Sequence, residues 1–255
     1  MSAVALGRPR VHLRSTDSTN ERARVLAAEG APHGTLVTAS AQSAGRGRQG
    51  RRWSAPAGSS LLMSLILRDP PVLLPLMSAL AVCDVAGPEA LIKWPNDIVL
   101  ELAPAQGGSE PLLGKLAGIL IEGRPQAGWA VLGVGLNVAV RIEDLPAELR
   151  AERGAQRPAA SLGRSREDVE PLLAELLVTL EDRLAAHEQE TLEAWRERDA
   201  LRGRMVSWST GRGRAAGIDG MGRLVVELPE GGQTELGAGE VHLERIGGQP
   251  TEEGD

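Results

Sequence analysis

Two consecutive apolar segments constrain the fold of this chain most strongly: KLAGILIEGR (115–124) and GWAVLGVGLNVAV (128–140). Both are rich in Val, Ile and Leu, and three residues that include a proline separate them. Short apolar runs bounded by turn residues are typical of β-strands. Because the connection is so short, we expect the two strands to pair as an antiparallel hairpin within a sheet.

Further strands and helices are predicted on both sides of this hairpin. Ser18 with Glu21 three residues later suggests a capping box at the start of a helix. A buried helix is expected to end at Gly87, because glycine is favoured after a helix C-terminus. Leucines at helical spacing predict a long amphipathic helix. The expected elements are helices within 16–30, 71–87, 166–190 and 191–201, strands at 34–40, 59–69 and 90–101 with a turn at 94–97, and a loop over 98–113.

The C-terminal part of the chain has a different residue pattern. From 203 to 246, short β-like runs alternate with glycine-rich turns, which predicts a small barrel-like β domain. We therefore expect a catalytic or binding domain over 1–200, a small β domain over 201–247 and a disordered tail at 248–255. The predicted fold class is α+β, with a mixed sheet flanked by helices.

Charge and cysteine content limit the kinds of function. The formal net charge of −6 argues against a general nucleic-acid or acidic-membrane surface, since both need a basic field. The single cysteine excludes an internal disulfide. The longest apolar run, 72–83, contains a proline and is too short to span a bilayer. No signal peptide is apparent, and we expect a cytoplasmic protein that does not bind membranes.

Against this acidic background, GRGRQGRRWS (45–54) carries four arginines and no acid. It matches the G-x-G-x-x-G pattern, but Pro56 prevents the helix that a dinucleotide-binding fold needs there. GGSEPLLGKL also fails as a phosphate-binding P-loop, because Ser109 replaces its first glycine and Leu116 its Ser/Thr. What remains is a flexible loop of guanidinium and N–H groups suited to closing over a phosphate or carboxylate.

The rare polar residues of this chain are concentrated in four short motifs. Of 28 basic residues only two are lysines, and there are three asparagines. Each motif alone has an ordinary structural explanation, as a helix cap, a hairpin turn, a strand edge or a close strand contact. Together, STN (18–20), KWPND (93–97), GKLAG (114–118) and GVGLN (133–137) hold both lysines and all three asparagines. Such concentration indicates one polar ligand site.

The order of these motifs resembles the catalytic region of biotin–protein ligases. The resemblance covers about 18–137 and consists of S-T-N, Q-x-x-G-R-G-R-x-G-R-x-W, K-W-P-N-D, G-K-L-A-G-I-L and G-x-G-x-N. The segment around Gly239, Glu240 and Val241 is similar to the small SH3-like domain of those enzymes. The resemblance implies a class II synthetase-like catalytic domain followed by an SH3-like barrel.

The resemblance also implies a reaction and a set of site residues. Biotin would be activated by ATP, with Mg²⁺, to biotinyl-5′-AMP, and the biotinyl group would pass to a lysine of a biotin carboxyl carrier domain. Lys115 would be the central catalytic cation, with Arg48 and Arg46, and the arginine loop would act as a lid that is disordered until anions close it. The implied biotin-binding residues are Ser18, Thr19, Asn20, Gln42, Gly45, Arg46, Gly47, Arg48, Lys115, Gly118 and Gly133. The implied ATP-binding residues are Arg48, Arg51, Trp53, Lys93, Asn96, Asp97, Lys115 and Asn137, and the ligands of the metal are left open.

Two alternative functions remain, and the sequence departs from the family's pattern in some places. A lipoate–protein ligase would share the broad fold, although the arginine loop and KWPND favour biotin. A single-strand or RNA-binding module would stack bases on aromatic side chains, and this chain has five tryptophans but no Phe or Tyr. Only 17 residues precede Ser18, so we expect no specific DNA binding; homodimerisation is left open. Glu244 stands where the family has an arginine, which puts a nucleotide contact from the C-terminal domain in doubt.

Overall fold

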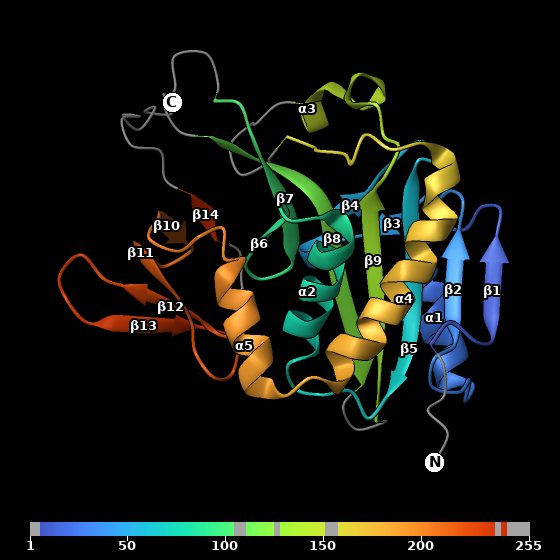
Figure 1. Cartoon of the computed structure of the whole chain (residues 1–255), viewed down its shortest axis with the longest axis horizontal. Helices are drawn as coiled ribbons and strands as arrows, with labels where there is room; N and C mark the ends of the chain where they lie inside the picture. Colours follow the sequence, from blue (N-terminus) through green and yellow to red (C-terminus); the bar gives the residue numbers. More distant parts are fainter. Residues whose placement is uncertain (1–5, 105–110, 125–127, 151–157, 238–240, 244–255) are drawn as a thin grey trace.

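The computed structural model describes residues 6–104, 111–124, 128–150, 158–237 and 241–243 (Figure 1). Its centre is a seven-stranded sheet in the order β1-β2-β5-β9-β8-β7-β6. Only the β1–β2 pair is parallel, so the sheet is mixed, as predicted. The strands are β1 (Arg10–Leu13), β2 (Leu36–Ala39), β5 (Ser60–Arg68), β6 (Leu91–Lys93), β7 (Asp97–Leu102), β8 (Leu112–Arg124) and β9 (Trp129–Asn137).

The predicted hairpin is confirmed at the middle of this sheet. β8 and β9 pair antiparallel from Ala117 opposite Leu136 to Arg124 opposite Trp129. Strand β1, RVHL, was not predicted, because four residues with mostly exposed side chains carry little apolar signal. The loop predicted over 98–113 is shorter than expected, since 98–102 belong to β7 and 112–113 to β8. Of the remaining connection, 105–110 lie outside the described residues.

Helices cover both faces of the sheet, which explains why its central strands are apolar in both directions. α2 (Leu74–Ala86) and α4 (Val169–Ala185) lie on one face, and α1 (Thr19–Ala28) lies on the other (Figure 1). α2 ends at Gly87 as predicted, and α5 (Glu188–Glu197) follows α4 after a break. Three short elements complete the large domain: α3 (Ala147–Arg150), β3 (Gly45–Arg46) and β4 (Arg52–Trp53).

Strand β9 has core residues on one face of the sheet and cavity-lining residues on the other. Its even-numbered residues, from Ala130 to Leu136, belong to the main hydrophobic core beneath α2 and α4. Its odd-numbered residues face α1, where Trp129 and Val131 pack in a smaller cluster. Continuing along that face, Gly133, Gly135 and Asn137 line a cavity. The period of two in a strand therefore places the polar and glycine positions of GVGLN on one surface.

The C-terminal part forms a separate antiparallel sheet in the order β13-β12-β11-β10-β14 (Figure 1). Its inward side chains, among them Val206 and Leu224, join the same hydrophobic core as the large sheet. The small β unit is thus present, but the pairs among the described residues form an open five-stranded sheet and do not include the closed barrel expected. Its strands are β10 (Met205–Trp208), β11 (Gly211–Ile218), β12 (Leu224–Glu227), β13 (Gln233–Leu236) and β14 (His242–Leu243). The tail predicted at 248–255 lies outside the described residues.

The connection between the two sheets contains a carboxyl group with an altered pKa. Asp199 lies beside β6, where Ile92 donates to the Arg198 carbonyl at 2.7 Å and accepts from the Ala200 N–H at 2.9 Å. Burial raises the pKa of Asp199 to about 6, against the partly offsetting backbone N–H groups of Leu201 and Arg202. The folded protein thus binds this proton more tightly than the unfolded chain does.

We expect Asp199→Asn to change how stability depends on pH. Between about pH 4 and pH 6, the folded wild type keeps a proton that the unfolded chain has lost, so its free energy of unfolding falls as pH rises. The neutral amide removes this loss, on the order of 2 kcal/mol, so the variant gains more relative to wild type at pH 7.5 than at pH 4.5. Urea unfolding at both pH values measures the difference. An equal effect of the substitution at both would contradict the assignment.

Within the described ranges, no helix combines the length and apolarity that crossing a bilayer requires.

Candidate active site

A cavity of about 910 Å³ opens on the α1 face of the large sheet. Among the described residues that line it, six are cationic and one, Asp97, is acidic. The cations are Arg46, Arg48, Arg51, Arg52, Lys93 and Lys115. All the site residues predicted from the sequence line this cavity except Gly45. A chain with a net charge of −6 thus concentrates positive charge in one hollow, as a site for an anionic ligand requires.

One end of the cavity is built by the start of α1. Thr19 and Asn20 are buried, and the Ser64 hydroxyl of β5 lies 2.8 Å from Thr19 Oγ1 and 2.6 Å from Asn20 Oδ1. The Asn20 amide donates to the Leu120 carbonyl at 3.2 Å and to Glu122 at 3.0 Å. This network fixes the side chains that face the cavity. It therefore forms a rigid polar wall.

The predicted capping box at this helix is wrong. Ser18 is the N-cap residue, but its side chain makes no cap hydrogen bond. The cap hydrogen bond comes instead from Gln42, in a distant loop. Its Oε1 accepts from the Thr19 N–H at 2.7 Å and from the Thr19 hydroxyl at 3.1 Å. Glu21 instead pairs with Arg24 at 2.9 Å and Arg46 at 2.8 Å. The helix is thus capped by a tertiary contact and not by the local motif that the sequence suggested.

We expect Gln42→Ala to destabilise the protein by about 1 kcal/mol, because a helix N–H loses its partner. The start of α1 would also loosen at the polar end of the cavity. Thermal unfolding gives the change in stability, with Gln233→Ala as the control, since Gln233 is exposed on an outer strand of the C-terminal sheet. Equal unfolding temperatures for the two variants would contradict a capping role for Gln42.

The arginine loop forms a short hairpin that closes one side of the cavity. β3 and β4 pair antiparallel, with Gly45 opposite Trp53. A side chain at Gly45 would lie 2.5 Å from the Trp53 carbonyl oxygen, so this glycine makes the hairpin possible without lining the cavity. Arg46 ties the hairpin to α1 and β8 through Glu21 at 2.8 Å and Glu122 at 3.2 Å. The loop that we expected to be disordered without anions therefore has partners of its own.

The Trp53 indole lies across the floor of the cavity. A Cβ atom at Gly135 would come within 2.6 Å of its ring, and one at Gly118 within 3.2 Å. Both glycines keep the sheet flat enough for an aromatic ring to approach the backbone. Lys115 Nζ is 5.9 Å from the centre of the same ring, within the range of a cation–π contact. Gly118 of GKLAG and Gly135 of GVGLN thus both make room for the Trp53 ring.

A β-bulge turns Lys115 toward the cavity. Ile98 pairs with Ala117 but Val99 pairs with Lys115, so Leu116 is an extra residue in β8. Leu116 and Ala117 are consecutive in sequence, yet both are buried in the main core. The bulge shifts the alternation, and Lys115 points to the site face, where its Nζ lies 2.6 Å from Asp97 Oδ1. The strand's simple period of two would have buried this lysine in the core.

Arg48 lies near the opposite charge of Asp97 and the like charge of Arg51. Burial is the main cause that lowers the pKa of Arg48, with Arg51 acting in the same direction and Asp97 opposing it. Arg48 is half-buried, and the like charge of Arg51 acts on its guanidinium. An incoming anion would relieve this repulsion, so the geometry favours binding of phosphate or carboxylate here.

The remaining polar residues of the motifs line the cavity but hold the structure together as well. Asn96 donates to the Ile119 carbonyl at 2.8 Å and thereby fastens the KWPND turn to β8. Asn137 donates to the Ala160 carbonyl at 2.9 Å and accepts from Ser60 at 3.2 Å, which positions the segment after α3. Lys93 is buried at the end of β6. The two asparagine amides are thus largely occupied by backbone groups.

Sequence reasoning missed one wall of the cavity. Leu145, Pro146, Leu149 and Ala159 form an apolar edge beyond Asn137. They lie in a segment without a distinctive pattern, and only the fold brings them beside β9. Ser64 was also missed, because a serine within an apolar strand gave no signal of its contact with α1.

Comparison with known proteins identifies the family. Residues 12–138 match the model of the biotin/lipoate A/B protein ligase family. The chain is 35% identical over 254 residues to biotin--[acetyl-CoA-carboxylase] ligase of Mycobacterium tuberculosis, covering 89% of this chain and 86% of that protein. It is 34% identical over 242 residues to the enzyme of the same name from Paracoccus denitrificans, covering 87% and 95%. It is 32% identical to the bifunctional ligase/repressor BirA of Bacillus spizizenii, covering 91% and 73%.

The fold agrees with these similarities. The structure of biotin protein ligase from Aquifex aeolicus in complex with biotin and ATP superposes with a TM-score of 0.72, covering 94% of this chain and 100% of that one, at 24% identity. The match covers both the large mixed sheet and the C-terminal sheet. By its sequence and its fold, the chain belongs to the biotin/lipoate A/B protein ligase family.

Proposed function

We propose that this protein is a biotin–protein ligase, which activates biotin with ATP and transfers the biotinyl group to a lysine of a biotin carboxyl carrier domain. The observation that carries this proposal is the cavity of this chain, with six cations around one carboxylate. The chain is also similar to proteins that are named biotin--[acetyl-CoA-carboxylase] ligases. Two anionic substrates must be held together before they react. Their mutual repulsion is the main obstacle, and fixed cations reduce it.

The chemistry proceeds in two balanced steps. A biotin carboxylate oxygen attacks the α-phosphorus of ATP, and the bond to the β-phosphate breaks to release pyrophosphate. The lysine amine of the carrier then attacks the acyl carbon, loses a proton and releases AMP. In the first step Lys115, which Asp97 and the Trp53 ring hold toward the cavity, would bridge the carboxylate and the α-phosphate. Arg48 and Arg46 would support it from the hairpin.

The two ends of the cavity suggest where each substrate lies. The side chains of Thr19, Asn20 and Gln42 form a hydrogen-bonded wall with Ser18 beside it, and Gly133 opens space next to Asn20. This wall suits the polar ring of biotin. The other end suits the nucleotide. It contains Arg51, Trp53, Lys93, Asn96, Asp97 and Asn137 next to the apolar edge at 145–149. The large indole of Trp53 offers a surface on which a flat base can stack.

Magnesium is expected with ATP, and the donor set limits how the chain could hold it. Among the described residues no cluster of three His, Cys, Asp or Glu side chains is placed to bind a metal. Asp97 is the one carboxylate lining the described cavity. This fits an ion held mainly by phosphates and water, with Asp97 as the protein ligand. When bound, Mg²⁺ shields the charge of the triphosphate.

The organisation of the chain completes the proposal. We assign catalysis to residues 1–200 and a small SH3-like barrel to 201–247, of which the described residues form the five-stranded sheet. Action in the cytoplasm and the absence of specific DNA binding remain predictions, and homodimer formation stays open. Light scattering of the purified protein tests the last of these.

ATP–pyrophosphate exchange, run separately with biotin, lipoate and octanoate, tests the proposed reaction. We expect exchange with biotin alone. The family name covers biotin and lipoate ligases alike, so exchange with lipoate or octanoate would keep the adenylation chemistry and overturn the assigned substrate. No exchange with any acid, from folded protein with Mg²⁺, would overturn the function itself.

A further inference from the structure

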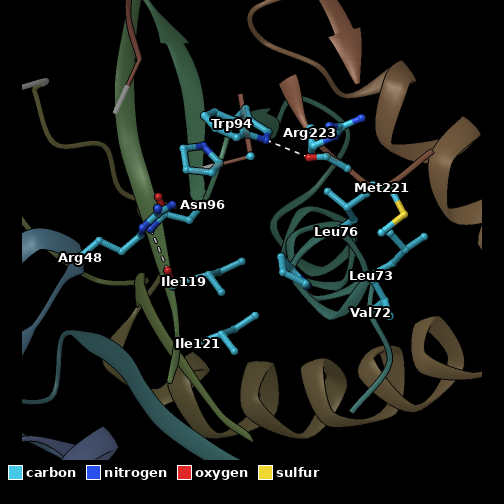
Figure 2. Close-up of a pocket in the computed structure, with 14 residues that line it drawn as sticks. Arg48, Val72, Leu73, Leu76, Trp94, Asn96, Ile119, Ile121, Met221 and Arg223 are labelled. Carbon is cyan, nitrogen blue, oxygen red and sulfur yellow. Dashed lines mark hydrogen bonds between the residues drawn. The ribbon is translucent and has the colours of Figure 1, made fainter. Parts of the chain in front are cut away.

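A second cavity, of about 320 Å³, lies between the two sheets (Figure 2). Ile119 and Ile121 of β8 face Leu73 and Leu76 of the α2 region across it, and Met221, in the turn between β11 and β12, lies at its edge. The Trp94 indole closes one end, donating to the Gly222 carbonyl at 3.1 Å. No step of the proposed mechanism uses this cavity.

Its rim exposes large apolar side chains. Val72 is 70% exposed and Met221 is 63% exposed, and they project from different parts of the fold onto the same cavity. The one other described large hydrophobic residue of similar exposure is Val178, at 61%, on α4 away from both cavities. Two such residues converging on one hollow indicate a contact surface for another molecule.

The second cavity adjoins the first. Arg48, Pro95, Asn96 and Ile119 line both, so the two meet at the KWPND turn. A side chain that enters the second cavity from this rim would therefore approach residues that also line the proposed reaction site. This position is what a macromolecular acceptor needs if one of its lysines is to reach the activated acyl group.

The charges of the second cavity suit an apolar protein surface better than more of the nucleotide. Its outer arginine, Arg223, is paired with Asp219 at 2.6 Å and lies 3.8 Å from Glu235. Among the described residues, the positive charge on this side of the cavity is therefore compensated by carboxylates. Most of its other lining groups are aliphatic or aromatic.

We propose that the Val72–Met221 groove docks the acceptor protein, receiving apolar side chains that lie near the target lysine on the surface of the carrier domain. This inference rests on the proposed function and names the surface by which the same site recognises its protein substrate. Docking would exclude water from the apolar rim and direct the lysine past Asn96 and Arg48.

The two half-reactions separate docking from adenylation. Val72→Asp and Met221→Asp place a charge on the groove, and Val178→Asp is the matched control. Because all three residues are exposed, the variants should fold, and circular dichroism verifies this. Biotin-dependent ATP–pyrophosphate exchange needs no acceptor, whereas biotinyl transfer to a purified carrier domain does.

We expect both groove variants to keep wild-type exchange while their KM for the carrier rises at least tenfold, roughly the effect of losing one important interface residue. The control should match wild type in both assays. A carrier domain whose target lysine is replaced by alanine should inhibit the wild type and inhibit the groove variants less.

Three results would overturn the docking proposal. An unchanged carrier KM in both groove variants would do so while leaving the ligase function intact. A raised KM for ATP in the exchange assay would assign the groove to the nucleotide. Dissociation of a wild-type dimer by the substitutions, with carrier KM unchanged, would make the groove an interface between copies of this chain. Absence of exchange in the wild type would instead overturn the ligase function, and the docking proposal with it.

Discussion

Lys115→Ala is expected to lower the rate of biotin-dependent ATP–pyrophosphate exchange by at least about 100-fold with the fold intact. Removal of one preorganised group that stabilises transition-state charge typically costs 100- to 1,000-fold. We expect a loss near the upper end of this range, because the substitution also removes the ammonium that lies 2.6 Å from Asp97. Without the Lys115 ammonium, the negative charge of Asp97 would repel both incoming anions more strongly.

A double variant separates these two causes. In Lys115→Ala/Asp97→Asn the repulsive charge is gone, so recovery of exchange would show that Lys115 serves only to neutralise Asp97. We expect the double variant to remain inactive, because no cation then bridges the two substrates. Asp97→Asn alone is the control for loss of the proposed magnesium ligand, and it should retain more exchange than the double variant. Arg141→Ala is the control for loss of a positive charge, since Arg141 is exposed and pairs locally with Glu143 at 2.9 Å. Full exchange by the single variant would refute the catalytic role of Lys115.

Gly133→Ala is expected to raise the KM for biotin about 100-fold. A Cβ atom at this position would lie 2.0 Å from Asn20 Oδ1, far inside van der Waals contact. The Asn20 side chain cannot move freely, because it is hydrogen-bonded to Ser64, the Leu120 carbonyl and Glu122. Relieving the overlap therefore breaks the polar wall. It should also reduce the free energy of unfolding by about 1–3 kcal/mol.

The exchange assay with varied biotin and varied ATP measures the effect on each substrate. We expect the KM for ATP to change much less than the KM for biotin, because Gly133 lies at the α1 end of the cavity. Gly220→Ala is the control glycine, since a Cβ atom there meets nothing within 4 Å. A variant that folds and binds both substrates normally would show that this wall does not contact biotin.

The sequence predicted the regular elements well wherever the signal was local. The 115–140 hairpin, the strand at 59–69 and the helix ending at Gly87 follow from apolar period, turn residues and helix caps. Strand β1 was missed because an edge strand with exposed side chains has no such pattern. The capping box predicted at Ser18 was wrong, because the side chain that caps this helix is Gln42, which belongs to another loop.

The site residues were predictable for a different reason. Lysine and asparagine are so rare in this chain that their concentration in four motifs marked a shared ligand site, and the cavity contains all five. The sequence alone could not tell which residues have structural duties. Asn96 and Asn137, for example, bond to the Ile119 and Ala160 carbonyls, which are neighbours only in the folded protein.

The sequence by itself thus determined the elements, the family and the polar residues of the site, because those depend on composition, spacing and motif order. Only the tertiary structure decided which way Lys115 points, through the bulge at Leu116. It alone also placed Trp53 over two glycines and joined Val72 to Met221 across a groove. These relations depend on strand register and on packing between distant segments, which no local pattern encodes.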